Sequence, residues 1–125
     1  MQKLVLAGKS MGGRVGCHVA LEASVAGLIC FGYPLRGQNG KLRDQVLLAL
    51  ATPVMFVQGA RDPMCPLEEL DRVRQQMSAR SEVFVVEGGD HSLEATKTSL
   101  RARGTTQPQV ELAVLDAVRG FCAAL

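Results

Sequence analysis

Three residue types that together perform nucleophilic catalysis occur in order along this 125-residue chain: Ser10, then Asp62, then His91. Ser10 stands within Gly8-Lys9-Ser10-Met11-Gly12, a G-x-S-x-G pattern typical of a sharp strand-to-helix turn that presents a serine hydroxyl. We expect Ser10 to act as the nucleophile and His91 to take its proton and later pass it to the leaving group. Asp62 would orient the imidazole. The chemistry predicted is acyl transfer through an acyl-Ser10 intermediate.

The glycines around the serine are expected to allow a tight turn. We predict that side chains at Gly8 and Gly12 would collide with the strand and the helix that the turn brings together. Gly13 and Gly16 extend this run of small residues and would let the helix lie close to the strands. The backbone N–H of Met11, at the start of that helix, is the predicted oxyanion donor.

The same letters permit two other interpretations. Gly8-Lys9-Ser10 is also the end of a phosphate-binding loop, but that motif needs a glycine where Lys3 stands. A strand, a turn and a helix with an incidental serine is the simpler alternative. The order of Ser10, Asp62 and His91 favours a catalytic role over both, because each residue follows a predicted strand.

Other residues could replace the predicted acid and base. Glu87 and Asp90 are acidic residues close to His91 in sequence, but they belong to the same loop. Asp62 is preferred because it comes from the end of a different strand. His18 falls inside the first predicted helix, where packing or surface exposure is the simpler interpretation.

The apolar pattern predicts alternating strands and helices. Short continuous apolar runs indicate buried strands, and apolar residues three and four apart indicate helices. Strands are expected at 4–7, 27–32, 54–59 and 82–87, helices at 14–23, 42–50, 67–80 and 110–125, and a solvated, mobile loop at 92–108.

This alternation predicts an α/β fold, a parallel sheet with helices on both faces. Ligands of such sheets gather at the carboxyl ends of the strands. Since Ser10, Asp62 and His91 each follow a strand, we expect all of them along that one edge of the sheet.

Composition limits the class of protein further. The chain is 47% hydrophobic and 21% charged, which predicts one globular domain over residues 1–125. A net charge of +2 gives no argument for nucleic acid, and no apolar run has the length of a membrane span. Scattered cysteines indicate reduced thiols in a cytoplasmic protein, and two histidines argue against a metal site. No cofactor is expected.

Several motifs together resemble one subfamily of the α/β-hydrolase fold, which includes testis-expressed protein thirty and the third subunit of the non-specific lethal complex. The similarity covers almost the whole chain. It rests on Gly8-Lys9-Ser10-Met11-Gly12-Gly13-Arg14, Gly32-Tyr33-Pro34-Leu35, Lys41-Leu42-Arg43-Asp44, Val57-Gln58-Gly59-x-Arg61-Asp62-Pro63 and Asp90-His91-Ser92-Leu93.

The resemblance implies a serine hydrolase acting on a small-molecule ester or thioester, or else a non-catalytic module that binds proteins. One departure from the family is Arg36-Gly37-Gln38, where relatives tend to carry histidine and proline. The other is length, because the chain begins at the nucleophile strand and so corresponds to the C-terminal half of the domain. That implies loss of a second oxyanion donor, and self-association or a protein partner at the exposed sheet edge.

Overall fold

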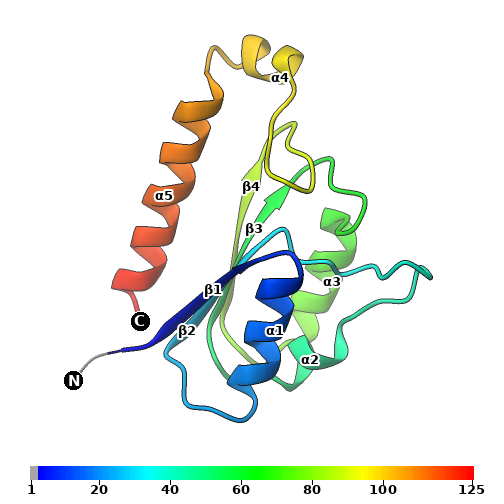
Figure 1. The fold of residues 1–125 in the computed structure, drawn as a ribbon, viewed down its shortest axis with the longest axis vertical. Coiled ribbons are helices and arrows are strands. Elements are labelled where there is room, and N and C mark those ends of the chain that lie inside the picture. The colour runs from blue at the N-terminus through cyan, green and yellow to red at the C-terminus, as the bar shows by residue number, and fades with distance from the viewer. Residues whose placement is uncertain (1–2) are drawn as a thin grey trace.

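The computed structural model describes residues 3–125 and consists of four strands and five helices within that range (Figure 1). In chain order the elements are β1 (Val5–Lys9), α1 (Met11–Ala20), β2 (Gly27–Phe31), α2 (Gln45–Ala49), β3 (Val54–Gly59), α3 (Leu67–Gln76), β4 (Ser81–Val86), α4 (Lys97–Ala102) and α5 (Gln107–Ala123).

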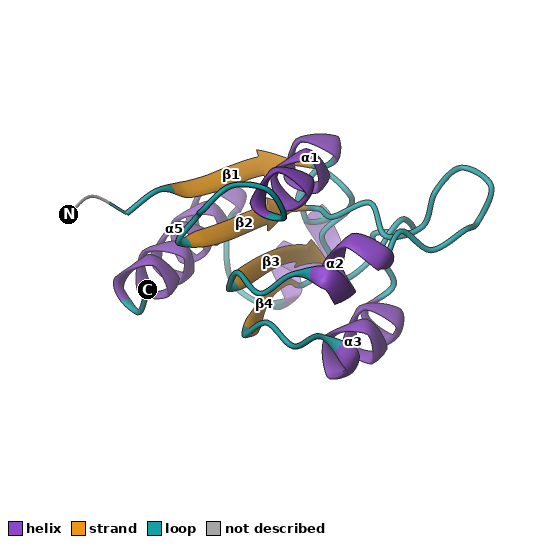
Figure 2. Ribbon diagram, turned by 90° about the horizontal axis from the view of Figure 1, so that it is seen from below, coloured by secondary structure: helices purple, strands orange, loops and turns teal. Residues whose placement is uncertain are grey.

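The strands form one parallel sheet in the order β1-β2-β3-β4, so each strand pairs with the next in sequence. Helices α1, α2 and α3 cover one face, and α5 covers the other (Figures 1 and 2). The predicted fold class is therefore confirmed. Within residues 3–125, no helix combines the length and apolar character needed to cross a membrane.

Two apolar cores form because successive residues of a strand point to opposite faces. In β2 and β3, Leu28 and Phe56 face α1–α3, while Ile29 and Met55 face α5. Strands buried on both faces are continuously apolar, which is why these runs were recognisable without an alternating pattern. The sheet between the two cores holds the strand ends in fixed relative positions.

The segment 92–108 differs from the solvated loop expected from its polar sequence. It contains α4, whose cap residue Thr96 accepts a hydrogen bond from the Ser99 backbone N–H at 3.1 Å. Thr106 forms a capping box with Gln109 and starts α5 three residues earlier than predicted. Cap side chains satisfy the N–H groups at a helix start, so polar residues here favour helix rather than loop.

Helix α2 is shorter than the predicted 42–50, because its expected first turn belongs to a hairpin. Leu42 pairs with Arg36 in an antiparallel bridge. The buried Tyr33 hydroxyl donates to the Arg43 carbonyl oxygen at 2.8 Å, which fixes that backbone outside the helix. Helix formation begins only after Asp44.

Strand β1 forms one outer edge of the sheet and pairs only with β2 among the described residues. Apolar side chains are exposed close to it: Leu4 is 58% exposed, and Val15 and Val19 on α1 are 52% and 43% exposed. Unpaired backbone groups beside exposed apolar residues favour association with another chain.

We expect the chain to self-associate through this edge. Replacing Val15 and Val19 together by glutamate places charges on the exposed side of α1, so the associated fraction should fall. Light scattering after size-exclusion chromatography measures it. Gln75→Glu, an exposed change on α3, is the control and should leave association unchanged. A monodisperse monomer of the unmodified chain would contradict this expectation.

Candidate active site

Ser10 occupies the turn between β1 and α1 in a strained backbone conformation, with φ 51° and ψ −117°. A positive φ is uncommon for a residue with a side chain, and such strain persists only where the surroundings enforce it. The Ser10 N–H donates to the Phe31 carbonyl oxygen of β2 at 2.8 Å, which ties the turn to the sheet. The predicted sharp turn is therefore present.

Two glycines make this turn sterically feasible, and they are not the predicted pair. A Cβ at Gly8 would lie 2.3 Å from the Gly12 carbonyl carbon. A Cβ at Gly13 would lie 3.0 Å from the Gly8 carbonyl oxygen and 3.2 Å from Cys30 Cβ. At Gly12 a Cβ would meet nothing within 4 Å, so the expected collision there is wrong. The helix approaches the strand one residue later, through Gly13.

The structure brings the predicted serine, histidine and aspartate into one hydrogen-bonded chain. Ser10 Oγ lies 2.8 Å from His91 Nε2, and His91 Nδ1 lies 2.8 Å from Asp62 Oδ2. The imidazole thus bridges the hydroxyl and the carboxylate through its two nitrogens. This arrangement lets Nε2 accept the hydroxyl proton while Nδ1–H donates to the carboxylate.

Burial differs along this chain of residues. The Asp62 side chain is fully buried and the His91 side chain is 27% exposed. Asp62 Oδ1 also accepts a hydrogen bond from the Met64 backbone N–H at 2.8 Å. The carboxylate is thereby held in one orientation, while the imidazole remains partly exposed.

The rival acids and the rival base lie elsewhere. Asp90 Oδ1 accepts from the backbone N–H groups of Ser92 and Glu94, at 2.8 and 3.0 Å, so Asp90 shapes the turn that carries the histidine. Glu87 is exposed, and no hydrogen bond joins its carboxylate to His91 among the described residues. His18 is exposed on α1.

Two further glycines position the histidine loop, and sequence reasoning missed both. A Cβ at Gly59 would lie 2.2 Å from the Asp90 carbonyl oxygen. Gly32 has φ +67°, and a Cβ there would lie 2.7 Å from the His91 carbonyl oxygen. Each glycine directly follows or ends a predicted strand, which was the available signal. Their missing side chains let the loop bearing His91 rest against the ends of β2 and β3.

The first residues of α1 supply the candidate oxyanion donors. Ser10 is the cap residue of α1, but its side chain makes no capping hydrogen bond, because Oγ is directed to His91. The N–H groups of Met11 and Gly12 stand at the start of the helix and have no acceptor within it, so they remain oriented toward the turn. Met11, the predicted donor, is the first residue of α1 and directly follows the serine.

The thiols of Cys65 and Cys30 are poor alternative nucleophiles. Burial, together with neighbouring carboxylates, raises the pKa of the Cys65 thiol to about 12. The pKa of the Cys30 thiol lies well above its usual value, because Cys30 is hydrogen-bonded to Cys17 and is buried. A protonated thiol is a weak nucleophile. The serine is therefore the better-placed nucleophile at this end of the sheet.

A parallel sheet carrying a serine turn and a histidine-aspartate pair at its carboxyl edge defines a hydrolase-type α/β protein. A family model described as "Alpha/beta hydrolase domain" matches residues 1–122, and the chain belongs to this family. The match covers every strand and both loops that bear the histidine and the aspartate.

Solved structures show the same fold. An alpha-beta serine hydrolase homologue from Coxiella burnetii is 26% identical, with a TM-score of 0.62, over 92% of this chain and 49% of its own. A thermophilic esterase from Thermogutta terrifontis is 21% identical, with a TM-score of 0.56, over 92% and 55%. An esterase domain from Rhodothermus marinus is 15% identical, with a TM-score of 0.57, over 72% and 53%. The chain thus spans about half the length of these structures.

Replacing Gly59 by alanine should disturb both stability and the site. The new Cβ would overlap the Asp90 backbone, so we expect a loss of about 1–3 kcal/mol and displacement of His91. The matched control is Gly120→Ala on α5, where a Cβ meets nothing within 4 Å. Chemical denaturation measures stability, and the rate at which a fluorophosphonate probe labels Ser10 reports the geometry of the site. Equal stability of the two variants would contradict this role of Gly59.

Proposed function

We propose that this chain carries the catalytic half of a serine hydrolase acting on esters or thioesters. The hydrogen-bonded chain from Ser10 through His91 to Asp62, with both distances at 2.8 Å, is the observation that carries the proposal. Membership of the alpha/beta hydrolase domain family supports it. The similar fold of the Thermogutta terrifontis esterase is compatible with ester hydrolysis by this chain.

The proposed reaction starts with transfer of the Ser10 hydroxyl proton to His91 Nε2 as Oγ attacks the substrate carbonyl carbon. A tetrahedral intermediate forms, and the imidazolium then protonates the leaving alcohol or thiol as the bond to it breaks. Water, deprotonated by His91, then attacks the acyl-Ser10 ester, and His91 returns that proton to Ser10 Oγ as the bond to the acyl group breaks and the acid leaves. Asp62 stabilises the imidazolium in each half of the reaction.

The negative oxygen of the intermediate needs hydrogen-bond donors that are already in place. We propose the Met11 backbone N–H as one such donor, aided by the positive end of α1. Loss of a single oxyanion donor typically lowers the rate by about 10²–10³-fold. Turnover by this chain should thus depend on whether a second donor is supplied.

The subfamily of testis-expressed protein thirty and the non-specific lethal complex subunit is the proposed branch of the family, on the motifs quoted above. The segment that departs from that pattern does not enter the triad. Arg36 Nε and Nη2 donate to Glu69 Oε1 and Oε2, each at 2.6 Å. This bidentate ion pair holds the loop against α3.

A protein-binding module is the second candidate function, and the open edge of β1 favours it. The exposed apolar residues near that edge offer a surface on which another strand could pair. A binding role requires no reactive serine, so the two functions predict different outcomes with a reactive probe. A small molecule is the expected partner for catalysis, and a protein is the expected partner for binding; neither use requires a cofactor. The four free cysteines fit a protein of the reducing cytoplasm.

A fluorophosphonate probe should label the unmodified chain at the serine. Ser10→Ala should abolish labelling, and Asp62→Asn should slow it by about 10³–10⁴-fold because the imidazole loses its orienting acceptor. In-gel fluorescence and peptide mass spectrometry measure the label. Ser92→Ala removes an exposed serine of the same loop as His91 and should label normally, as should His18→Gln.

Two results would decide against catalysis. Labelling that persists in Ser10→Ala would place the reactive group elsewhere. A lack of labelling in both this chain and a form extended at its N-terminus would favour the binding module. Hydrolysis of a p-nitrophenyl ester by the extended form alone would locate the second oxyanion donor outside this chain.

A further inference from the structure

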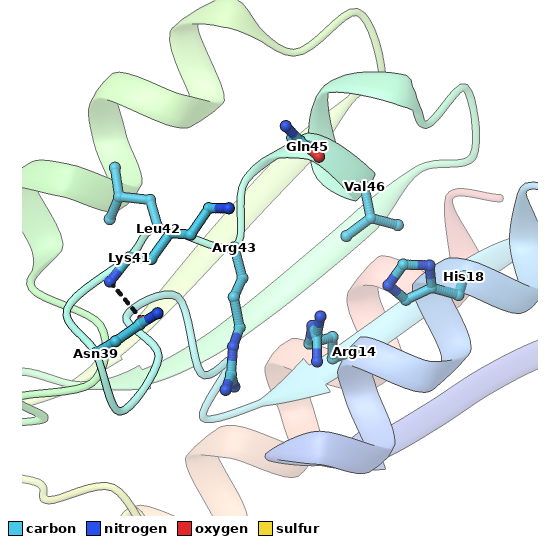
Figure 3. Close-up of a pocket in the computed structure, with 8 residues that line it drawn as sticks. All are labelled: Arg14, His18, Asn39, Lys41, Leu42, Arg43, Gln45 and Val46. Carbon is cyan, nitrogen blue, oxygen red and sulfur yellow. Dashed lines mark hydrogen bonds between the residues drawn. The ribbon is translucent and has the colours of Figure 1, made fainter.

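A cavity lies on the side of α1, and none of Ser10, Asp62 and His91 lines it. Its volume is about 300 Å³, and it opens between α1 and the segment 39–46 (Figure 3). Cationic and amide side chains dominate the lining, and no carboxylate contributes to it. The lining residues are Arg14, His18, Asn39, Lys41, Leu42, Arg43, Gln45 and Val46.

The positive charges of this cavity are not neutralised within the part of the chain described. The ion pairs found there join Arg36 to Glu69, Arg74 to Asp71, and His91 to Asp62. None of them involves the cations of the cavity, Arg14, Lys41 and Arg43. Like charges around one concave surface repel one another and attract an anion.

Arg14 provides a separate sign that an acceptor is wanted. Its Nε is buried and has no hydrogen-bond partner among the described residues. Its Nη1 reaches only the Met11 sulfur, at 3.6 Å, which is a weak acceptor. A buried donor without a partner is unfavourable, especially on a charged group, so the Arg14 guanidinium has unused donor capacity beside the cavity.

The opposite wall of the cavity is held in place by its backbone. The Arg43 N–H donates to the Leu35 carbonyl oxygen at 2.6 Å, and the Arg43 carbonyl accepts from the Tyr33 hydroxyl at 2.8 Å. Burial raises the pKa of Tyr33, so this hydroxyl keeps its proton and remains a donor. The Lys41 N–H donates to Asn39 Oδ1 at 3.0 Å (Figure 3). Lys41 and Arg43 are thus presented by a loop whose backbone is held by hydrogen bonds.

We propose that this cavity binds the phosphate or carboxylate group of a small molecule. Two guanidinium groups, from α1 and from the loop, extend into the same space (Figure 3). Guanidinium groups match both anions through paired N–H donors. A volume of about 300 Å³ is at the lower end for ligand sites, which suits a small anionic group.

The position of the cavity links it to the serine. Arg14 follows Ser10 by one turn of α1, about 6 Å along the helix axis. An anion bound there could belong to the substrate whose ester lies at Ser10, which would rest on the proposed function. It could equally be a free ligand. The chemistry of the site is the same in both cases.

Binding of inorganic pyrophosphate and of citrate to the chain, measured by isothermal titration calorimetry, tests the site directly. We use the Ser10→Ala form, so that the result does not depend on hydrolysis. Binding should weaken with added salt. Arg43→Gln and Lys41→Gln should each weaken it about tenfold or more, and Arg43→Lys by less for pyrophosphate than for citrate.

The control is Arg101→Gln on α4, which removes an exposed cation distant from the cavity in sequence and should leave affinity unchanged. Melting temperatures establish that each variant is folded, and Lys41→Gln is the safeguard because Lys41 is exposed. No binding of either anion at millimolar concentration would overturn the proposal. Equal weakening by Arg101→Gln would overturn it too, since the effect would then be net charge.

A second measurement identifies the source of the anion. The ratio of kcat/KM for the 4-nitrophenyl monoester of succinate to that for 4-nitrophenyl butyrate should fall about tenfold in Arg43→Gln if the anion is part of the substrate. Arg101→Gln should keep the ratio. An unchanged ratio, with anion binding still lost in Arg43→Gln, would assign the site to a free ligand. Absence of hydrolysis by both this chain and its N-terminally extended form, with intact anion binding, would overturn the proposed function and keep this site.

Discussion

Close contact between backbones, made at a few glycines, is the constraint on which the site depends. Gly8 lets the first turn of α1 lie against β1, and Gly59 lets the histidine loop lie against β3. A Cβ added at either glycine would lie under 3 Å from a backbone atom of the facing segment, so no side chain fits there without a shift. The hydrogen bonds from Ser10 to His91 and on to the acid follow from these approaches, because the side chains themselves are short.

Electrostatics divides the carboxyl edge of the sheet and the adjacent side of α1 into two environments. Asp62 is fully buried and accepts hydrogen bonds from His91 and from the Met64 backbone, so its charge is compensated where it lies. Arg14, one helical turn beyond the serine, and Arg43, on the 39–46 segment, border a cavity that no carboxylate lines. A buried carboxylate thus lies against the histidine, and cationic side chains line the neighbouring cavity.

The open edge of β1 connects the fold to both candidate functions. The nucleophile turn begins at the end of this strand, so anything that pairs with β1 also supports the position of Ser10. Exposed Val15 and Val19 extend the apolar surface along α1. Strand pairing at this edge would reduce the freedom of the turn that carries Ser10.

The sequence by itself determined the strands, the parallel sheet and the order of Ser10, Asp62 and His91, because these depend on apolar runs and on glycines beside a serine. Tertiary structure alone decided what depends on residues far apart in the chain. The sequence already favours Asp62 over Asp90, because Asp62 follows a different strand; what the structure decided is the role of Asp90, which bonds its own turn. Within the segment 92–108, caps outweigh polarity and form α4 and the start of α5. The cationic cavity exists only where α1 meets the 39–46 loop.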